Sequence, residues 1–170
     1  LNVYEKRILL NYNMLDMDSV LSDADDYFSD FAKKMPMYKD VAEIEEEIMK
    51  MQATVLVIQD VLSQYADVSD NNYNEIINSL DALSGKKIYI NGTEYHDETE
   101  EDFTPDGTET EIIADEGWLC MYKYAAAQQM NKDPEIIAEY LQGVADSSEY
   151  MKTLVGSLLA TTYAGLLEDY

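Results

Sequence analysis

The stretch VAEIEEEIMKMQATVLVIQDVLSQY, residues 41–65, decides the fold of this chain. Its apolar residues recur at alternating steps of three and four, which is the spacing of one face of an α-helix. The middle of the stretch, residues 53–58, is apolar around most of the circumference, so other elements must cover more than one side of the helix. We therefore predict a mainly α fold, a multi-helix bundle around a long central helix at about residues 40–66. The apolar stripe consists of Val41, Ile44, Ile48, Met51, Val55, Ile58, Leu62 and Tyr65.

Shorter helices are predicted on both sides of this central helix. Residues 1–14 indicate a first helix or an extended lead-in. Asp18 or Ser19 can cap a second helix, which Pro36 would end, because a short side-chain oxygen accepts hydrogen bonds from free backbone N–H groups. The second helix combines an apolar face with an acidic face that contains Asp23, Asp25, Asp26 and Asp30. Later helices are expected at about residues 76–83, after Asp115, from Asp133-Pro134 onward, and at 147–168.

Between these helical blocks, the period of the sequence changes at about residues 86–113. Residues 88–95 predict two short strands around Asn91-Gly92, a dipeptide typical of a type I′ hairpin turn. Alternation at residues 108–113 indicates a third strand that would pair with the hairpin. The predicted organisation is therefore a single acidic helical-bundle domain, residues 1–170, with a β-hairpin and acidic-loop insertion at residues 86–114.

The last predicted helix carries a row of small residues at four-residue spacing: Gly156, Ala160 and Ala164. Such a row lets two helix backbones approach closely and make more dispersion contact than bulky side chains allow. We expect this row to pack on the central helix. A contact with another subunit is the alternative.

Charge is the most unusual property of the composition. The 170 residues include 35 acidic and 11 basic ones, which gives a net charge of −24 at pH 7. Such a surface repels nucleic-acid phosphates and anionic membranes, and it attracts cations and basic protein patches. No apolar run reaches the ~18 residues of a membrane span. We therefore predict a protein partner with a basic surface, or self-association, and neither direct nucleic-acid binding nor a membrane span.

The sequence lacks the motifs of the common catalytic chemistries. It contains one histidine, His96, and one cysteine, Cys120, and no glycine-rich phosphate loop, nucleophile elbow or zinc-protease motif. Cys120 lies in an apolar helical pattern, which favours a buried structural thiol. The carboxylates are too numerous for one pair to be singled out as an acid–base pair. We therefore predict that the protein is not an enzyme and holds no organic cofactor.

The acidic loop supports one metal-binding hypothesis. Residues 102–110 resemble the first half of an EF-hand loop, with oxygen ligands at positions one, three and five and glycine at position six. The twelfth position is Ile113 where an EF-hand requires a bidentate glutamate, so the EF-hand pattern fails. A looser calcium site at Asp97, Asp102 and Asp106 is the remaining alternative, because a divalent cation relieves the repulsion between clustered carboxylates. A solvated loop without an ion is the simpler interpretation.

Two segments are candidates for contact with a partner. The first is the acidic loop, where Phe103 lies among Glu98, Glu100 and Glu101. The second is the methionine-rich turn around Pro36, because methionine adapts its shape and tyrosine combines apolar area with a polar tip. Filling of a gap in the core is an equal alternative for this second segment. Its candidate residues are Met35, Met37 and Tyr38.

Three functions fit these features. The leading hypothesis is a non-enzymatic protein–protein interaction or assembly protein, such as a virion or cell-surface subunit whose chain was processed before Leu1. The second is an acidic nucleic-acid mimic that inhibits a DNA- or RNA-binding protein, of the anti-restriction or anti-CRISPR type. A mimic needs carboxylates in rows, for which Asp23, Asp26 and Asp30 and the acids of residues 94–116 are candidates. The third is an extracytoplasmic ligand-binding or sensor bundle, which needs an apolar pocket between helices.

Overall fold

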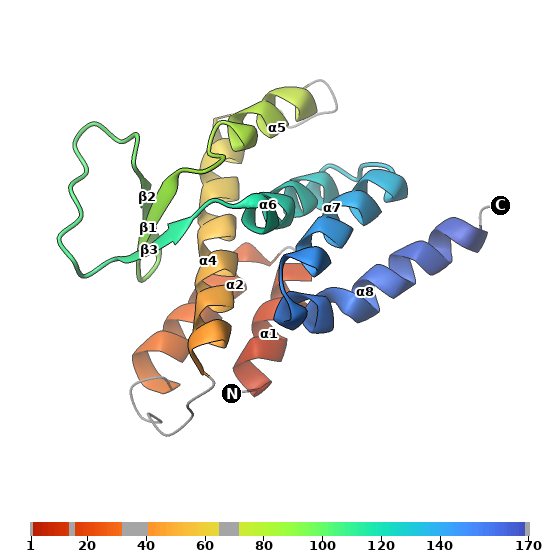
Figure 1. The fold of residues 1–170 in the computed structure, drawn as a ribbon, viewed down its shortest axis with the longest axis horizontal. Coiled ribbons are helices and arrows are strands. Elements are labelled where there is room, and N and C mark those ends of the chain that lie inside the picture. The colour runs from red at the N-terminus through yellow and green to blue at the C-terminus, as the bar shows by residue number, and fades with distance from the viewer. Residues whose placement is uncertain (1, 14–15, 32–40, 65–71, 169–170) are drawn as a thin grey trace. The chain divides into compact units, whose positions relative to one another are not determined.

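The fold is mainly α-helical with a small three-stranded antiparallel sheet, as the sequence predicts. A computed structural model describes residues 2–13, 16–31, 41–64 and 72–168 (Figure 1). Most elements are helices, and the strands lie together in the middle of the chain. In chain order the elements are α1 (Asn2–Asn13), α2 (Met17–Asp26), the π-helix η1 (Tyr27–Phe31), α4 (Val41–Ser63), α5 (Tyr73–Asp81), β1 (Lys87–Asn91), β2 (Glu94–Asp97), β3 (Thr110–Ile113), α6 (Glu116–Gln129), α7 (Pro134–Ser147) and α8 (Glu149–Glu168).

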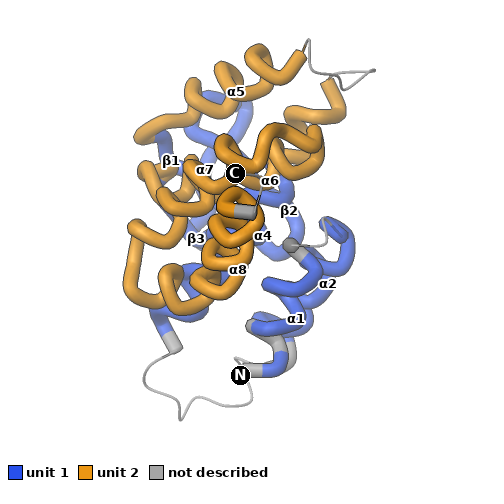
Figure 2. Tube along the Cα trace, turned by 90° about the vertical axis from the view of Figure 1, so that its right-hand side faces the viewer, with its two compact units in different colours: residues 1–57, 86–113 blue, residues 58–85, 114–170 orange. Residues whose placement is uncertain are grey.

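The chain divides into two compact units, which Figure 2 colours separately. The first unit comprises residues 1–57 and 86–113, and the second comprises residues 58–85 and 114–170. The boundary falls inside α4, after Val57. The strands belong to the first unit, and helices α5 to α8 belong to the second. The single-domain organisation that the sequence suggests stays a prediction.

Helix α4 confirms the helix predicted from the apolar stripe. Ile48 and Met51 are fully buried, and Val55 and Ile58 are 1% exposed. The buried polar side chains on this helix have hydrogen-bonding partners, as burial of polar groups requires. The Thr54 hydroxyl donates a hydrogen bond to the Lys50 carbonyl at 2.7 Å. The Gln52 side-chain amide donates a hydrogen bond to the carbonyl of Gly92 in the hairpin turn. Gln52 thus ties the hairpin to α4 within the first unit.

Helix α2 differs from its predicted form in two ways. It is capped by Asp16, whose Oδ1 accepts a hydrogen bond from the Ser19 backbone N–H at 3.2 Å, and not by Asp18 or Ser19. Asp23, expected on the acidic outer face, is only 2% exposed. Its carboxylate forms an ion pair with Arg7 of α1 and accepts a hydrogen bond from the Asn11 side chain at 2.9 Å. Burial of this carboxylate is tolerated because α1 supplies both partners.

The sheet has the strand order β2-β1-β3, and both pairings are antiparallel. Ile88, Ile90 and Ile112 form its buried face. The hairpin register pairs Asn91 with Glu94, so the two turn residues are Gly92 and Thr93. Only Gly92 of these has a positive φ, 59°. This is the requirement of a type II′ turn, which places glycine first, and it corrects the predicted type I′ turn centred on Asn91-Gly92.

The second unit packs helices α6, α7 and α8 in sequence. Ten residues of α6 are buried, including Trp118, Tyr122 and the predicted buried thiol Cys120. Two glycines permit close helix approach. A Cβ added at Gly117 would lie 2.3 Å from the Ser147 Cβ, and one added at Gly143 would lie 2.3 Å from the Cys120 Sγ. Lys123 of α6 forms a 2.7 Å ion pair with Asp81 of α5.

Helix α8 is buried only near its start, at Met151 and Val155. Its small-residue row is not covered, contrary to the expected packing on the central helix. Ala160 and Ala164 are exposed, and a Cβ added at Gly156 would have nothing within 4 Å. Among the described helices, none is long and apolar enough to cross a membrane.

Candidate partner-binding site

Three ring side chains stack on the outer face of the sheet. Tyr89 of β1 and His96 of β2 are register partners, so their side chains project on the same face. Phe103, from the loop between β2 and β3, lies against both of them. Its ring centroid is 4.2 Å from that of His96, with ring planes 11° apart, and 5.4 Å from that of Tyr89. Phe103 therefore fixes the middle of the loop to the sheet through apolar and aromatic contact.

The loop of residues 98–109, here called the acidic loop, is also held by hydrogen bonds. The Glu100 Oε2 lies 2.6 Å from the His96 Nδ1. The Glu100 backbone N–H donates to the Asp97 carbonyl at 3.2 Å, and the Phe103 N–H donates to the Glu100 carbonyl at 3.3 Å. Asp97 accepts further hydrogen bonds from the Thr99 backbone N–H, at 2.6 Å, and from the Thr99 hydroxyl. The start of the loop is thus a pair of successive tight turns.

A third turn orders the far end of the acidic loop. The Asp106 Oδ1 accepts hydrogen bonds from the Thr108 backbone N–H at 2.8 Å and from the Thr108 hydroxyl at 2.7 Å. These bonds favour the charged carboxylate and lower the pKa of Asp106 below its ordinary value. Gly107, between them, adopts a φ of 85° that L-residues rarely reach. The carboxylate of Asp106 thus serves the turn geometry.

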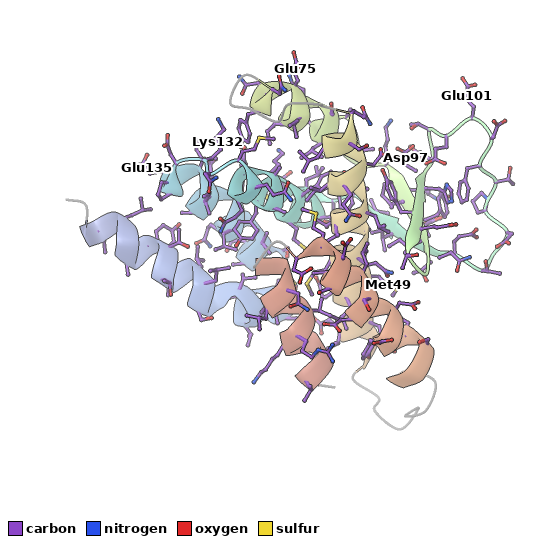
Figure 3. All side chains as sticks on the ribbon, turned by 180° about the vertical axis from the view of Figure 1, so that it is seen from behind. Met49, Glu75, Asp97, Glu101, Lys132 and Glu135 are labelled. Carbon is purple, nitrogen blue, oxygen red and sulfur yellow. The ribbon has the colours of Figure 1, made fainter. Side chains whose placement is uncertain are left out.

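The acidic loop and its flanking strands β2 and β3 carry a large net negative charge. Residues 94–116 contain no lysine or arginine. Lys87 of β1 contacts Glu111 of β3 across the sheet with an Nζ–Oε2 distance of 3.1 Å, and its hydrogen bond to Glu111 raises the Lys87 pKa. Figure 3 shows Glu101 at the outer bend of the loop, pointing away from the sheet, whereas Asp97 lies beside the strand. The field around this region therefore favours cationic groups.

A shallow hollow of about 400 Å³ lies on this surface. Its lining is mainly apolar and includes the rings of Phe103 and His96, together with three acidic residues. Such a hollow accepts a long basic side chain, whose methylenes contact the rings while its charged end reaches the carboxylates. The lining residues are His96, Glu100, Glu101, Asp102 and Phe103.

The structure brings some of the sequence-predicted partner residues together. Glu100, Glu101 and Phe103 line one hollow, and Glu98 is exposed where the loop begins. The other predicted segment, Met35, Met37 and Tyr38, lies outside the described residues. Partner binding by either segment stays a prediction.

The predicted calcium ligands are spread along the loop. Asp97 and Asp106 each bind the threonine two residues further on, and Asp102 is exposed near the outer bend. In the described part of the chain, no three histidine, cysteine or acidic side chains converge as a metal site requires. Calcium binding at Asp97, Asp102 and Asp106 stays a prediction.

Sequence reasoning did not find the contribution of Tyr89 and His96 to this site. Both residues lie on strands, and their contact with Phe103 depends on how the loop returns over the sheet. The one available signal was the alternation of 88–95, which places Tyr89 opposite the face of Ile88 and Ile90. Which residue covers Tyr89 depends on contacts between segments that are distant in the sequence.

Comparison with protein families, with curated proteins and with solved structures finds no match to this chain. Its function must therefore be inferred from its own residues.

Proposed function

We propose that this protein is a non-enzymatic interaction protein that binds a basic surface of a partner protein through its acidic loop. The observation that carries the proposal is the Phe103 contact. A loop rich in acidic residues is fixed to a sheet by a ring stack, and its acidic residues other than the half-buried Glu109 are exposed. A loop ordered in this way loses less conformational entropy when it binds than a free loop would.

The charges of the loop would act mainly on association. Exposed carboxylates raise the rate of encounter with a cationic partner and lose influence as salt screens them. The stacked rings of Phe103 and His96 add the apolar contact that a purely electrostatic patch lacks. Charge thus selects the partner class, and the ring stack contributes affinity.

The other two hypotheses receive less support. A nucleic-acid mimic needs rows of surface carboxylates, and Asp23, one member of the candidate row, is buried in an ion pair with Arg7. A ligand-binding bundle needs an apolar pocket between helices. The hollow at Phe103 lies on the sheet and is lined by three acidic residues, and a second hollow of about 480 Å³ is lined by residues of a single helix, Val3, Lys6, Arg7 and Leu10 of α1.

A matched pair of triple variants tests the proposal. In the loop variant, Glu98, Glu100 and Glu101 are each changed to Gln. In the control variant, the exposed residues Glu75, Glu135 and Glu149 of the second unit are each changed to Gln. Each variant loses three negative charges, so the two have the same net charge. The probe is a fluorescein-labelled nonapeptide of alternating lysine and valine, and its binding is followed by fluorescence anisotropy at about 50 and 300 mM salt.

We expect the loop variant to bind the peptide about tenfold more weakly than the wild type at low salt, because three exposed charge contacts contribute about 0.2–1 kcal/mol each. The control variant should bind within about twofold of the wild type. Equal weakening in the two variants would show a response to net charge alone and would contradict the proposed site.

A further inference from the structure

The outer side of β3 is an unpaired strand edge. The strand order β2-β1-β3 places β1 in the centre, and among the described residues no strand pairs with the far side of β3. Thr110, Glu111 and Ile113 are exposed, and Ile113 keeps 53% of its surface in solvent. An edge of this kind presents N–H and C=O groups that can pair with another chain.

The direction of backbone hydrogen bonds alternates along each strand, and this alternation identifies the backbone groups of β3 that face outward. The Glu98 N–H donates to the Lys87 carbonyl at 3.1 Å, so Lys87 directs its backbone groups toward β2. Backbone groups of successive strand residues point to opposite sides, so Ile88 and Ile90 direct theirs toward β3. Their register partners there are Ile112 and Thr110.

The backbone N–H and C=O groups of the alternate residues of β3 therefore point away from β1. Ile112 and Thr110 use their N–H and C=O groups on β1, which leaves those of Glu111 and Ile113 on the outer edge. A second contact supports this alternation: the Ala114 carbonyl accepts a hydrogen bond from the Gly85 N–H at 2.9 Å, on the inner side. The outer edge of β3 thus offers two donors and two acceptors, from Glu111 and Ile113.

The opposite edge of the sheet is already occupied in part. By the same alternation, Tyr95 and Asp97 direct their backbone groups outward from β2. The Asp97 carbonyl accepts the Glu100 N–H at 3.2 Å, because the acidic loop turns back there. Of the two edges, β3 is therefore the one that can accept a whole strand segment.

We propose that an extended, basic segment of a partner protein adds to the outer edge of β3 as a fourth strand. This inference rests on the proposed function and specifies how the partner binds. The backbone of the segment pairs with Glu111 and Ile113, whose side chains share one face of β3. Lysine or arginine side chains on that face approach Glu109 and Glu111, and their methylenes cover Ile113. The occupant is basic because residues 94–116 contain eleven acids without a single lysine or arginine, and the neighbouring strand β1 contributes one lysine, Lys87, which pairs with Glu111.

Charge also argues against a second copy of this chain as the occupant. Pairing of β3 with another β3 would bring the two copies' Glu109 and Glu111 together, and like charges on neighbouring strands destabilise a sheet. Acidic residues on an edge strand are a common protection against such self-pairing. A cationic strand would instead meet Glu109 and Glu111 with the opposite charge.

Amide hydrogen exchange tests the geometry directly. In the free protein, the Glu111 and Ile113 amides should exchange fast and the Ile112 amide slowly. Binding of the lysine–valine nonapeptide should slow exchange at Glu111 and Ile113 by at least about tenfold and leave Ile112 unchanged. Unchanged exchange at Glu111 and Ile113 in the bound protein would overturn the strand addition.

Two backbone changes test the hydrogen bonds separately from charge. Glu111→Pro removes an outward N–H and leaves the inner ladder intact, and Glu111→Gln removes the same charge and keeps the N–H. We expect Glu111→Pro to bind the nonapeptide at least about threefold more weakly than Glu111→Gln, which corresponds to one lost hydrogen bond. A nonapeptide methylated at every backbone nitrogen keeps all charges and should bind the wild type at least about tenfold more weakly than the parent peptide.

These arms separate the inference from the proposed function. If the loop variant loses affinity while Glu111→Pro matches Glu111→Gln and backbone methylation has no effect, the acidic loop binds by charge alone and the strand addition is wrong. If the Glu111→Pro and methylation effects appear while the loop variant binds like its control, the strand addition stands and the acidic loop is not the binding site. Absence of binding in every arm overturns both. Should Glu111→Pro unfold, the methylated peptide and the wild-type protein decide the question.

Discussion

Helices α6 and α8 belong to the same unit and have opposite environments. Ten of the fourteen residues of α6 are buried although it carries Glu116 and Lys123. Helix α8 has no charged residue between Lys152 and Glu168. Its described buried apolar side chains are nevertheless only Met151 and Val155, and Leu167 is 77% exposed. Apolar composition makes burial favourable, but the neighbours that the fold supplies decide whether burial happens.

The glycines of this unit show the same contrast at atomic scale. Gly143 of α7 leaves room for Cys120 of α6, and Gly117 of α6 leaves room for Ser147 of α7. Gly156 and Gly165 of α8 face open space. Mid-helix glycine lowers helix stability, so close packing offsets that cost between α6 and α7 and not along α8. Replacing these glycines by alanine should therefore lower the free energy of unfolding at the α6–α7 contact and raise it in α8.

The largest expected effect is at Trp118. Trp118→Ala should lower the free energy of unfolding by about 3–5 kcal/mol, because a large buried side chain is replaced by a cavity. Leu167→Ala, at the exposed end of α8, is the control and should change it by less than about 0.5 kcal/mol. Urea unfolding followed by circular dichroism measures both. A comparable loss in Leu167→Ala would show that α8 is covered in solution.

The next effect is expected at the α6–α7 contact. Gly143→Ala should cost about 1–3 kcal/mol, because the new methyl group would overlap the Cys120 Sγ and force the helices apart. Cys120→Ala removes the overlapping sulfur, so the double variant should be less destabilised than the sum of the two single variants. Strict additivity in this urea double-mutant cycle would count against the contact.

Alkaline pH should destabilise the protein through Cys120, the residue at the α6–α7 contact. Burial raises the pKa of the Cys120 thiol to about 11 from an ordinary 9.0, and burial likewise raises the pKa of Tyr124. The unfolded chain therefore releases these protons at a lower pH than the folded protein does. The free energy of unfolding keeps its full value below about pH 9 and falls as pH rises toward 11. Urea midpoints at pH 7, 8.5 and 10 should show this fall. Cys120→Ala should have a shallower decline, and identical slopes would contradict the assignment.

The smallest effect should have the opposite sign. Gly156→Ala should stabilise the protein by about 0.5–1 kcal/mol, because alanine favours helix and the added Cβ meets no atom within 4 Å. Thermal unfolding at a fixed low protein concentration measures this gain. A loss of stability in place of a gain would mean that another surface packs against Gly156.

Much of the fold could be predicted because its signals are local. The apolar stripe of α4, the Asp133-Pro134 start of α7 and the glycine of the hairpin each act within a few residues. Two differences are local: Asp16 caps α2 in place of Asp18 or Ser19, and the hairpin turn has the geometry of type II′. The burial of Asp23 required distant partners. Asp23 was assigned to an outer face because its neighbours in sequence are acidic, whereas Arg7 and Asn11 of α1 allow its burial.

The candidate site divides in the same way. Its acids and Phe103 could be read from composition, because an acidic run without lysine or arginine predicts an exposed anionic surface whatever its conformation. The stack of His96, Phe103 and Tyr89 could not, since it depends on the path of a loop over a sheet. The outward direction of Glu111 and Ile113 also required the observed register, because a shift of one residue would exchange the two sides of the strand.

The sequence by itself determined where helices and strands form and that the surface is strongly acidic. These properties follow from side-chain periodicity, capping and charge, which act over a few residues. The tertiary structure decided that α6 is buried while α8 is largely exposed, that Asp23 lies inside, and that β3 lies at an edge of the sheet. Those outcomes depend on which distant segments come into contact. The free energy of such a contact depends on both segments, so the local sequence of one segment does not set it.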